Sequence, residues 1–190
     1  MEQKVSKAYK FRIYPTKKQE IFFDNHFGCT RFIYNHLLAE RSRLWKEEGI
    51  SITGFDAKRM IPLLKKSKEF NWLKEVNSQS LQEAALDLEK GFKRFFKKIG
   101  GASHPKLKKK GVRKSFCIPQ NFSVDSTNNF IRIPKCKTPI KTKFHRSLKD
   151  VTKLNSLTIS MSFCRKYYVS INVYEKIEIK KKRVEKVTKK

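Results

Sequence analysis

The stretch 8-AYKFRIYPTKKQEIFF-23 decides how the fold of this chain begins. Apolar and polar side chains alternate from position 9 to position 14, which is the period-two pattern of a strand with one buried face. Pro15 ends that alternation, and Thr16 followed by Gln19 forms a capping-box pattern that predicts a helix from about residue 17. A lone strand is not stable, since even an isolated hairpin is marginal in water. The strand at 8–14 must therefore pair with strands much later in the chain.

A long amphipathic helix is predicted directly after this capping box. Its apolar stripe recurs at spacings of three, four or seven residues and consists of Phe23, Phe27, Thr30, Tyr34, Leu37 and Leu44. Gly49 follows the stripe as a natural C-terminal cap. The pattern predicts one helix from about residue 17 to residue 48.

Two further helices are predicted before residue 101. A weaker helical segment begins at Asp56, and Pro62 inside it indicates a kink or an early stop. A stronger one follows Asn77 and ends at Gly100 and Gly101; its stripe is Leu81, Ala85, Leu88, Phe92, Phe95 and Ile99. These stripes need partners, so the middle of the chain is predicted to be a helical bundle.

After residue 101 the hydrophobic period changes from that of helices to that of strands. Short strand-like segments occur at 115–119, 130–134, 140–144, 157–163 and 167–174, the last two forming a hairpin. With the first strand they suit a small antiparallel β-barrel or sandwich. The expected fold is therefore α+β: residues 1–14 give the first barrel strand, 15–101 an inserted helical domain, 102–176 the rest of the barrel, and 177–190 a basic linker or tail.

The charge balance points to a polyanionic partner. The chain of 190 residues carries 45 Lys and Arg against 17 Asp and Glu, a net charge of +28 and a pI near 10.1. Such a field concentrates nucleic acid at the surface. The sequence shows no membrane-spanning apolar run, secretory signal or lipidation signal, so we expect no membrane partner and a cytoplasmic, nucleoid-associated protein.

The residues that could carry catalysis or bind metal are scattered. Four cysteines lack the paired spacing of a zinc site, and we interpret them as small core residues. The acidic residues lie on predicted helices and loops among lysines, where caps and solvated faces are the ordinary use. No phosphate-binding glycine loop or nucleophile motif is present. We therefore expect no catalytic residues, no metal site and no cofactor.

A basic loop is the strongest binding feature in the sequence. Six cations fall within nine residues, a cluster that would attach to phosphates in a salt-sensitive way; they are Lys106, Lys108, Lys109, Lys110, Arg113 and Lys114. A run of this kind in isolation is often only solvated. The flanking aromatic residues and the charge of the whole chain favour direct contact with phosphate.

Amide side chains cluster at the start of the third helix. Asn77, Gln79 and Gln82 lie where a helix N-terminus could enter a groove, and such amides can read adenine edges. Alternatively, Asn77 or Ser78 only caps the helix and the glutamines face water. The residues themselves leave both interpretations open.

Ordered motifs along residues 7–174 resemble a known family. In chain order they read KAYKFRIYPTKKQE, FGCTRFIYNHLLAER, WLKEVNSQSLQEAALDLEKGFKRFFKK, PKLKKK, SFCIPQ, FIRIPK and SLTISMSFCRKYYVSI. This series resembles the N-terminal half of TnpB, the OrfB protein of bacterial insertion sequences, which is an RNA-guided DNA endonuclease. The resemblance implies an oligonucleotide-binding-like wedge barrel, interrupted by a helical recognition domain, that grips a guide RNA and reads a short motif in double-stranded DNA beside the target.

The resemblance also implies roles for individual residues. The positions that would read the DNA motif are Phe55, Ser78, Gln82, Gln120 and Asn121. Tyr9, Arg12 and the basic loop would face RNA or the heteroduplex backbone. His104 and Leu107 stand where the family usually has aromatic residues.

The family's nuclease domain is expected to be missing from these residues. In the family, a RuvC-like domain with a Gly-x-Asp segment, further carboxylates and a zinc ribbon follows the wedge barrel. The sequence ends before the first of those carboxylates, so we predict a truncated, nuclease-less relative that is not itself an enzyme. Two alternatives stay open: a protein-only helix-turn-helix regulator of DNA, and half of a split nuclease that acts with a separately encoded nuclease half.

Overall fold

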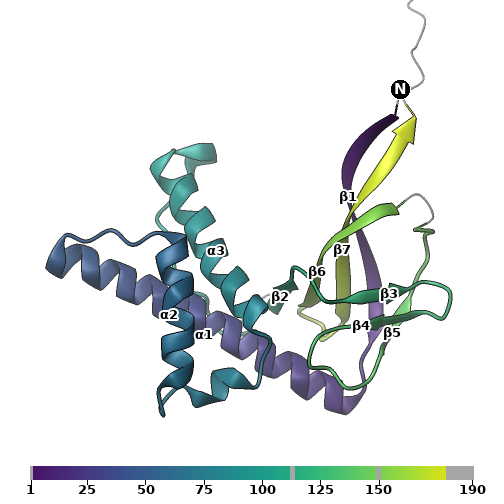
Figure 1. Ribbon diagram of the computed structural model, residues 1–190, viewed down its shortest axis with the longest axis horizontal. Helices are drawn as coiled ribbons and strands as arrows, with labels where there is room; N and C mark the ends of the chain where they lie inside the picture. The colour runs from purple at the N-terminus through teal and green to yellow at the C-terminus, as the bar shows by residue number, and fades with distance from the viewer. Residues whose placement is uncertain (1, 112–113, 149–150, 179–190) are drawn as a thin grey trace, which may run out of the picture.

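The computed structural model describes residues 2–111, 114–148 and 151–178, which form one strand, then three helices, then six strands (Figure 1). The first strand is β1 (Glu2–Tyr14), and the helices are α1 (Lys17–Glu48), α2 (Gly54–Lys66) and α3 (Ser78–Phe96). Short 3-10 turns occupy Asn71–Lys74 and Ile99–Gly101. The later strands are β2 (Lys114–Ile118), β3 (Ser123–Asp125), β4 (Phe130–Arg132), β5 (Ile140–Lys143), β6 (Val151–Met161) and β7 (Tyr167–Glu178).

All seven strands belong to one antiparallel sheet with the order β2-β6-β7-β1-β5-β4-β3. β1 lies in its interior, where it pairs with β7 from Glu2 opposite Glu178 to Ile13 opposite Tyr167. Its last residues, Arg12 to Tyr14, also pair with β5. The predicted long-range pairing of the first strand is confirmed, and the helices are an insertion between β1 and β2.

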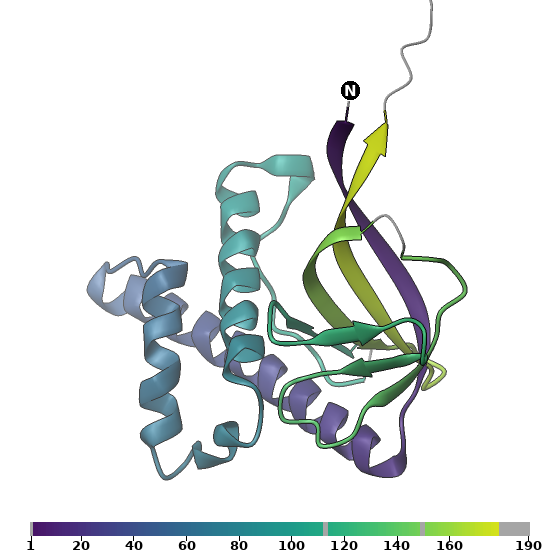
Figure 2. The same cartoon turned by 45° about the vertical axis from the view of Figure 1, so that its right-hand side comes forward.

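The sheet is curled but open, which corrects the prediction of a barrel. Its edges are β2 and β3, and no pairing joins them in the described part of the chain. β3 has three residues and β4 has three, so this side of the sheet is too short to curve round to β2. Figure 2 shows the resulting half-barrel, with β3, β4 and β5 folded across one end of the longer strands.

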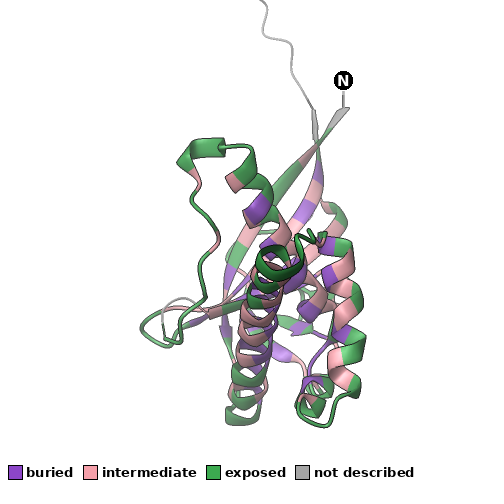
Figure 3. Cartoon of the chain, turned by 90° about the vertical axis from the view of Figure 1, so that its left-hand side faces the viewer, coloured by how far each residue is buried: buried purple, intermediate pink, exposed green. Residues whose placement is uncertain are grey.

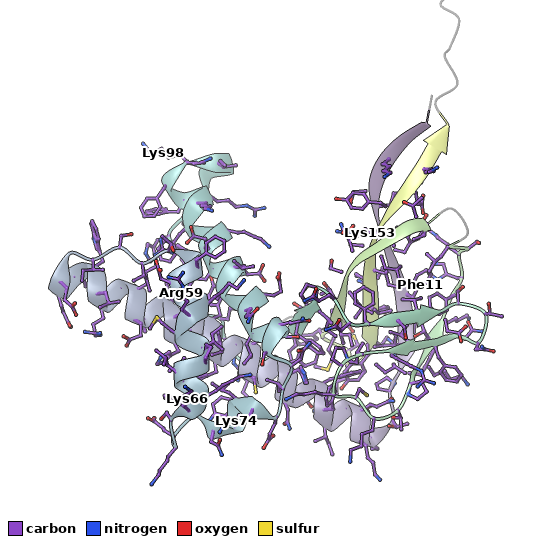
Figure 4. The ribbon with its side chains drawn as sticks, in the orientation of Figure 1. Phe11, Arg59, Lys66, Lys74, Lys98 and Lys153 are labelled. Atoms are coloured by element: carbon purple, nitrogen blue, oxygen red, sulfur yellow. The ribbon has the colours of Figure 1, made fainter. Side chains whose placement is uncertain are left out.

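The concave face of the sheet holds the first of two apolar cores. Alternate residues of β1, β2, β4, β5, β6 and β7 point inward, and Phe11, labelled in Figure 4, is fully buried among them. Phe23 and Phe27 enter the same core from α1. Their rings lie 6.1 and 5.4 Å from that of Phe116 on β2, so the start of α1 covers the inside of the curl. We call this set of residues the sheet core.

The start of α1 follows the predicted capping box. The Thr16 hydroxyl accepts a hydrogen bond from the Gln19 amide, and the Gln19 side chain accepts one from the Thr16 amide. Gln19 is buried and also donates to Thr138 Oγ1 at 2.9 Å and to the Pro139 carbonyl at 3.1 Å. The capping residue therefore also fastens α1 to the loop before β5. The helix ends at Glu48 with Gly49 in the left-handed conformation, as predicted.

The second core lies between the three helices. Buried residues of α1, α2 and α3 meet there, among them Ile33, Leu37, Ile61, Leu81, Leu88 and Phe92. We call this set the helical core. α2 begins two residues earlier than predicted because Thr53 and Asp56 form a second capping box, and it runs four residues past Pro62. α3 ends at Phe96, before the predicted Ile99, because Lys98 adopts a left-handed conformation.

His26 of α1 lies where the two cores meet. Its ring packs 4.7 Å from the ring of Phe116 in the sheet core, while its Nε2 accepts the backbone N–H of Asn77 at 3.2 Å. Nδ1 lies 2.9 Å from the Phe22 carbonyl, so the neutral ring with a proton on Nδ1 satisfies both contacts. Asn77 is also the N-cap of α3, one of the two capping residues between which the sequence left the choice open. One buried imidazole therefore links α1, α3 and β2.

Candidate nucleic-acid interface

The basic loop is fastened to the middle of α1. Asn35 accepts the Lys108 N–H at 2.8 Å and donates to the Lys108 carbonyl at 3.0 Å, so a single amide side chain holds the backbone on both sides. The Lys108 ammonium lies 4.0 Å from the centre of the Tyr34 ring, and its partial desolvation lowers the pKa of Lys108. Pro105 of the same loop lies close to Gly91 of α3. The loop is thus positioned by two helices rather than extended into solvent.

Four cations from three separate segments surround a hollow beside this loop. Arg31 comes from α1, Lys108 and Lys109 from the loop, and Lys114 from β2, and together with Phe27, Thr30 and Ser115 they line a cavity of about 330 Å³. Lys114 also forms an ion pair with Asp24 at 3.1 Å. We call these four cations the basic hollow. It can neutralise several phosphates of one strand at once.

A groove continues from the basic hollow between α3 and the edge of the sheet. Its volume is about 320 Å³, and it shares Thr30, Lys108 and Ser115 with the hollow. Ser80 of α3 lines it and is 1% exposed, with no hydrogen-bond partner for its hydroxyl. Glu83 and Asp87 bring carboxylates to the same wall. The groove is polar on both sides and more mixed in charge than the basic hollow.

The convex face of the sheet carries cations stacked on aromatic rings. Lys10 lies 4.6 Å from the centre of the Tyr168 ring, and the Arg12 guanidinium lies 5.1 Å from it and 5.6 Å from Tyr14. The register brings further lysines to the same face, because Arg12 pairs with Lys143 and Tyr14 with Lys141. One Arg12 nitrogen, Nη1, is buried without a partner. This surface, the outer sheet face, combines positive charge with stacking rings, which is the combination that binds single-stranded nucleic acid.

The residues predicted to read DNA lie in three different places. Ser78 and Gln82 lie one turn apart on α3, and the Ser78 hydroxyl accepts a bond from Lys65 of α2 at 2.6 Å. Gln120 and Asn121 follow β2 and are exposed, next to Pro119, which lines the groove together with Ser80. Their reading of DNA remains a prediction.

Phe55 is separated from the other predicted DNA-reading residues. It is 72% exposed near the start of α2, and the adjacent Gly54 lies against Glu89 of α3. Glu89 is eleven residues along α3 from Ser78, which corresponds to about 16 Å at the rise of a helix. Phe55 and Ser78 therefore lie toward opposite ends of the α2–α3 pair.

Tyr9 and Arg12, both predicted to face RNA, lie on opposite faces of β1. The Tyr9 hydroxyl donates to Glu175 on the concave side, and this bond raises the pKa of Tyr9. Lys7 also bonds Glu175, at 2.6 Å, and this bond is the main reason why the pKa of Glu175 is lowered. Arg12 points outward. The outer sheet face therefore includes Arg12 and leaves out Tyr9.

The other predicted phosphate-binding residues do not all reach the hollow. Lys106 and Lys110 are exposed along the loop, whereas Lys109 lines the hollow. Arg113 lies outside the described residues. Arg31, Lys10 and Tyr168 were missed by sequence reasoning, because each acquires its place only through contacts with distant segments. Of these three residues, only Lys10 could have been predicted from the sequence, because it lies on the polar face of the predicted first strand.

The histidine, cysteine and acidic side chains that the structure describes are dispersed rather than grouped as metal ligands. Within residues 2–111, 114–148 and 151–178, no three His, Cys, Asp or Glu side chains are grouped so as to hold a metal ion. Only Cys29 is a core residue, and burial raises its pKa to about 11. Cys117 and Cys136 are half-buried and Cys164 is exposed, which corrects the prediction that all four are in the core. None of the helices in the described part of the chain is long and apolar enough to cross a membrane.

The fold and these surfaces define a basic α+β protein with cations grouped on two surfaces, and sequence comparisons identify its relatives. A family model described as the helix-turn-helix domain of OrfB from IS605 matches residues 1–49. The chain is 31% identical over 171 residues to the putative RNA-guided DNA endonuclease InsQ of Escherichia coli, and 28% identical over 171 residues to a putative RNA-guided DNA endonuclease of Streptomyces pristinaespiralis. It is also 33% identical over 113 residues to the virulence protein VsdF of Salmonella dublin. The chain belongs to the TnpB (OrfB) family of insertion-sequence proteins.

The matches differ in how much of each relative they cover. The two endonuclease matches cover 90% of this chain and 41% and 42% of the relatives, so the chain spans about two fifths of their length. The VsdF match covers 55% of this chain and 93% of VsdF. In the structure, the residues matched by the helix-turn-helix model contain β1 followed by α1, a strand and one continuous helix. The elements that resemble two helices joined by a turn are α2, the 3-10 turn Asn71–Lys74 and α3.

Proposed function

We propose that this chain binds a structured guide RNA and double-stranded DNA, as the nucleic-acid-binding part of a TnpB-like system. The curled sheet would be the wedge domain, and α1 to α3 would be the recognition domain. A short DNA motif would be read by Ser78 and Gln82 of α3 together with Gln120 and Asn121, which follow β2. The proposal assigns no cleavage step to these residues, because the resemblance places the nuclease carboxylates in a segment other than the one that this chain matches.

The observation that carries the proposal is the basic hollow at the junction of the helices and the sheet. Arg31, Lys108, Lys109 and Lys114 converge there from α1, the loop and β2. The Asn35 clamp and the Tyr34 contact fix the loop in advance, so little order has to be imposed when a phosphate strand binds. The outer sheet face offers a second surface of the same sign. The names of the two endonuclease relatives support RNA as a partner.

A protein-only DNA regulator is the second candidate function. The order α2, 3-10 turn and α3 favours it. The description of the family model as a helix-turn-helix domain also favours it, although that model matches residues 1–49, which contain β1 and α1. In that case the start of α3 would enter the major groove without RNA. A third arrangement, half of a split nuclease, would require a separately encoded nuclease half.

RNA that copurifies with the protein separates these candidates. We expect a specific structured RNA, whose removal by ribonuclease weakens binding to a DNA duplex. Unchanged duplex binding after ribonuclease treatment would instead select the regulator. Cleavage that appears only after addition of a nuclease half would select the split enzyme.

Charge reversal in the basic hollow tests the interface directly. The double variant Arg31→Glu and Lys109→Glu should weaken RNA binding at least tenfold at low salt and should reduce the slope of log affinity against log salt by about two, one for each phosphate contact. The matched control is Lys17→Glu with Lys18→Glu, which makes the same charge change in the exposed first turn of α1. Equal losses in both variants would mean that only total charge matters and that the hollow is not the binding site.

A further inference from the structure

An aromatic pocket lies at the end of the helical region, apart from the basic hollow. The last turns of α1 and α3 and the chain around residue 104 enclose a cavity of about 500 Å³. We call this cavity the distal pocket; its lining includes Arg41, Trp45, Phe92, Phe95, Phe96 and His104. Figures 1 and 4 show the far end of α3, marked by Lys98, pointing away from the start of α1.

The rim of the distal pocket exposes large apolar side chains. Trp45 is 63% exposed and Phe96 is 68% exposed, on different helices that both line the cavity. Ile99, just after Phe96, is 55% exposed. Figure 3 shows the chain around this end of α3 in the exposed class. Aromatic surface grouped around a concave pocket is a feature of binding sites rather than of ordinary surfaces.

The floor of the pocket is held rigid by buried contacts. The Arg41 guanidinium lies 4.0 Å from the centre of the Phe92 ring and bonds Glu89 at 2.7 Å, with both charged side chains less than one fifth exposed. The His104 ring meets Phe92 and Phe95 edge-on at 5.2 and 5.4 Å. His104 therefore packs as an aromatic residue where the family usually has one. A planar ligand would enter a site whose rings are already positioned.

The charge around the pocket favours a nucleic-acid occupant over a protein one. Lys46 lines the cavity, and the exposed Lys97 and Lys98 directly follow Phe96. The carboxylates of this region are engaged by cations: Glu89 pairs with Arg41 and Lys93, and Glu47 and Glu48, which follow Lys46 on α1, pair with Arg43. A second copy of this chain would bring another net charge of +28 to the same surface, which opposes self-association.

The shape of the pocket favours an unpaired base over a duplex. A base inside a duplex presents only its edge, whereas a splayed-out base presents both faces to aromatic rings. We propose that the distal pocket binds one unpaired nucleobase, which stacks on Trp45 and the Phe95–Phe96 rings while Lys46, Lys97 and Lys98 neutralise the neighbouring phosphates. This inference rests on the proposed function, because the base belongs to the RNA or the opened DNA that the chain holds.

The fluorescence of Trp45 gives a direct test. The chain has two tryptophans, and in the full-length variant Trp72→Phe only Trp45 remains. Short single-stranded oligoadenylate should quench its emission in a saturable way, and a blunt duplex of the same length should quench it much less. In this background Phe96→Ala should weaken the response about fivefold to a hundredfold, the range expected for loss of one base-stacking ring. The matched control, Phe163→Ala, changes a phenylalanine that is 86% exposed at the β6–β7 turn and should leave the response unchanged.

Filter binding of the copurifying structured RNA, measured beside the Trp45 response, separates this inference from the proposed function. Retained RNA binding with no change in Trp45 emission would overturn the base pocket alone. Loss of both signals would overturn both proposals. Equal quenching by the duplex would exclude an unpaired base, and an emission change that depends on protein concentration without nucleic acid would show that a second copy covers the pocket.

Discussion

The helical region and the sheet region bury their apolar residues to different extents. Twelve large hydrophobic side chains are exposed among the described residues, and eight of them lie between residues 45 and 107: Trp45, Ile50, Phe55, Leu63, Trp72, Phe96, Ile99 and Leu107. The other four are Tyr14, Ile21, Phe130 and Phe163. The sheet curls over its own core and is closed by α1, whereas three helices cannot enclose every apolar side chain that they carry.

This difference bears on how each region would take part in the proposed binding of nucleic acid. The sheet region presents polar and cationic side chains on a surface supported by a continuous core, with Arg12 and Tyr168 as examples. The helical region instead leaves apolar surface at its ends, where Phe55 and the distal pocket lie. α1 contributes to both cores, so it joins the sheet region to the helical region.

Removal of β1 should disrupt the sheet region much more than the helical region, and it is the largest effect that we expect. Deleting residues 1–14 takes away the partner of both β7 and β5, as well as Phe11 and Ile13 from the sheet core. We expect loss of the strand signal in far-ultraviolet circular dichroism, while the two tryptophans, both in the helical region, report a smaller change. The control is Phe163→Ala, which should alter neither signal. A deletion variant that kept its full strand content would contradict the interior position of β1.

Acid should weaken the link between the two cores at His26. Desolvation lowers the pKa of His26 to about 4, below the value near 6.5 expected in the unfolded chain. The unfolded state therefore binds the proton first, and the stabilisation is complete above pH 6.5 and is lost as the pH falls toward 4. The full effect is about 3 kcal/mol in the free energy of unfolding.

Urea unfolding between pH 5 and pH 7 measures the contribution of His26 to the free energy of unfolding. The contribution of Glu175 does not change in this window, because the lowered pKa of that carboxyl places its titration at more acidic pH. His26→Gln should flatten the pH dependence in this window, and His36→Gln, which changes a half-buried histidine stacked on Phe32, should not. An unchanged slope in His26→Gln would exclude His26 as the titrating group.

The two capping boxes should show the smallest and most local effects. Thr16→Ala and Thr53→Ala each remove a hydroxyl that accepts a bond from the first turn of a helix, at a cost of about 1 kcal/mol. We expect Thr16→Ala to be the more costly, because its partner Gln19 also ties α1 to the loop before β5. The loss of stability in each variant, measured by thermal unfolding, compares the start of α1 beside the sheet with the start of α2 in the helical region. A larger loss of stability in Thr53→Ala would contradict the conclusion that Gln19 fastens α1 to the loop before β5.

Local signals in the sequence predicted the elements that depend on neighbouring residues. The start and end of α1 and the strand at β1 follow from capping residues and hydrophobic period, and the structure confirms them. The insertion of the helices was also predictable, because an isolated strand must find a distant partner. β3 was missed because three residues carry no period, and the open sheet was missed because closure depends on the lengths of several strands together.

The candidate interface was less predictable than the fold. The basic loop was visible as a run of lysines, but its hollow depends on Asn35, which lies 73 residues from Lys108. The distal pocket likewise joins Trp45 to Phe96 and His104 across three segments. Contacts of this kind leave no local pattern, so sequence reasoning found the charge and missed the cavities.

The interior position of β1 has a consequence for how the chain is made. β1 is synthesised before the other described elements, and its main partner, β7, is the last of them, so the contacts between the two strands are of very high sequence separation. The three helices can pack against each other long before β7 exists. Until then Phe11 and Ile13 have no sheet to enter. Assembly of the sheet is therefore expected to be the slow step of folding, and the apolar side chains of β1 stay uncovered until it is complete.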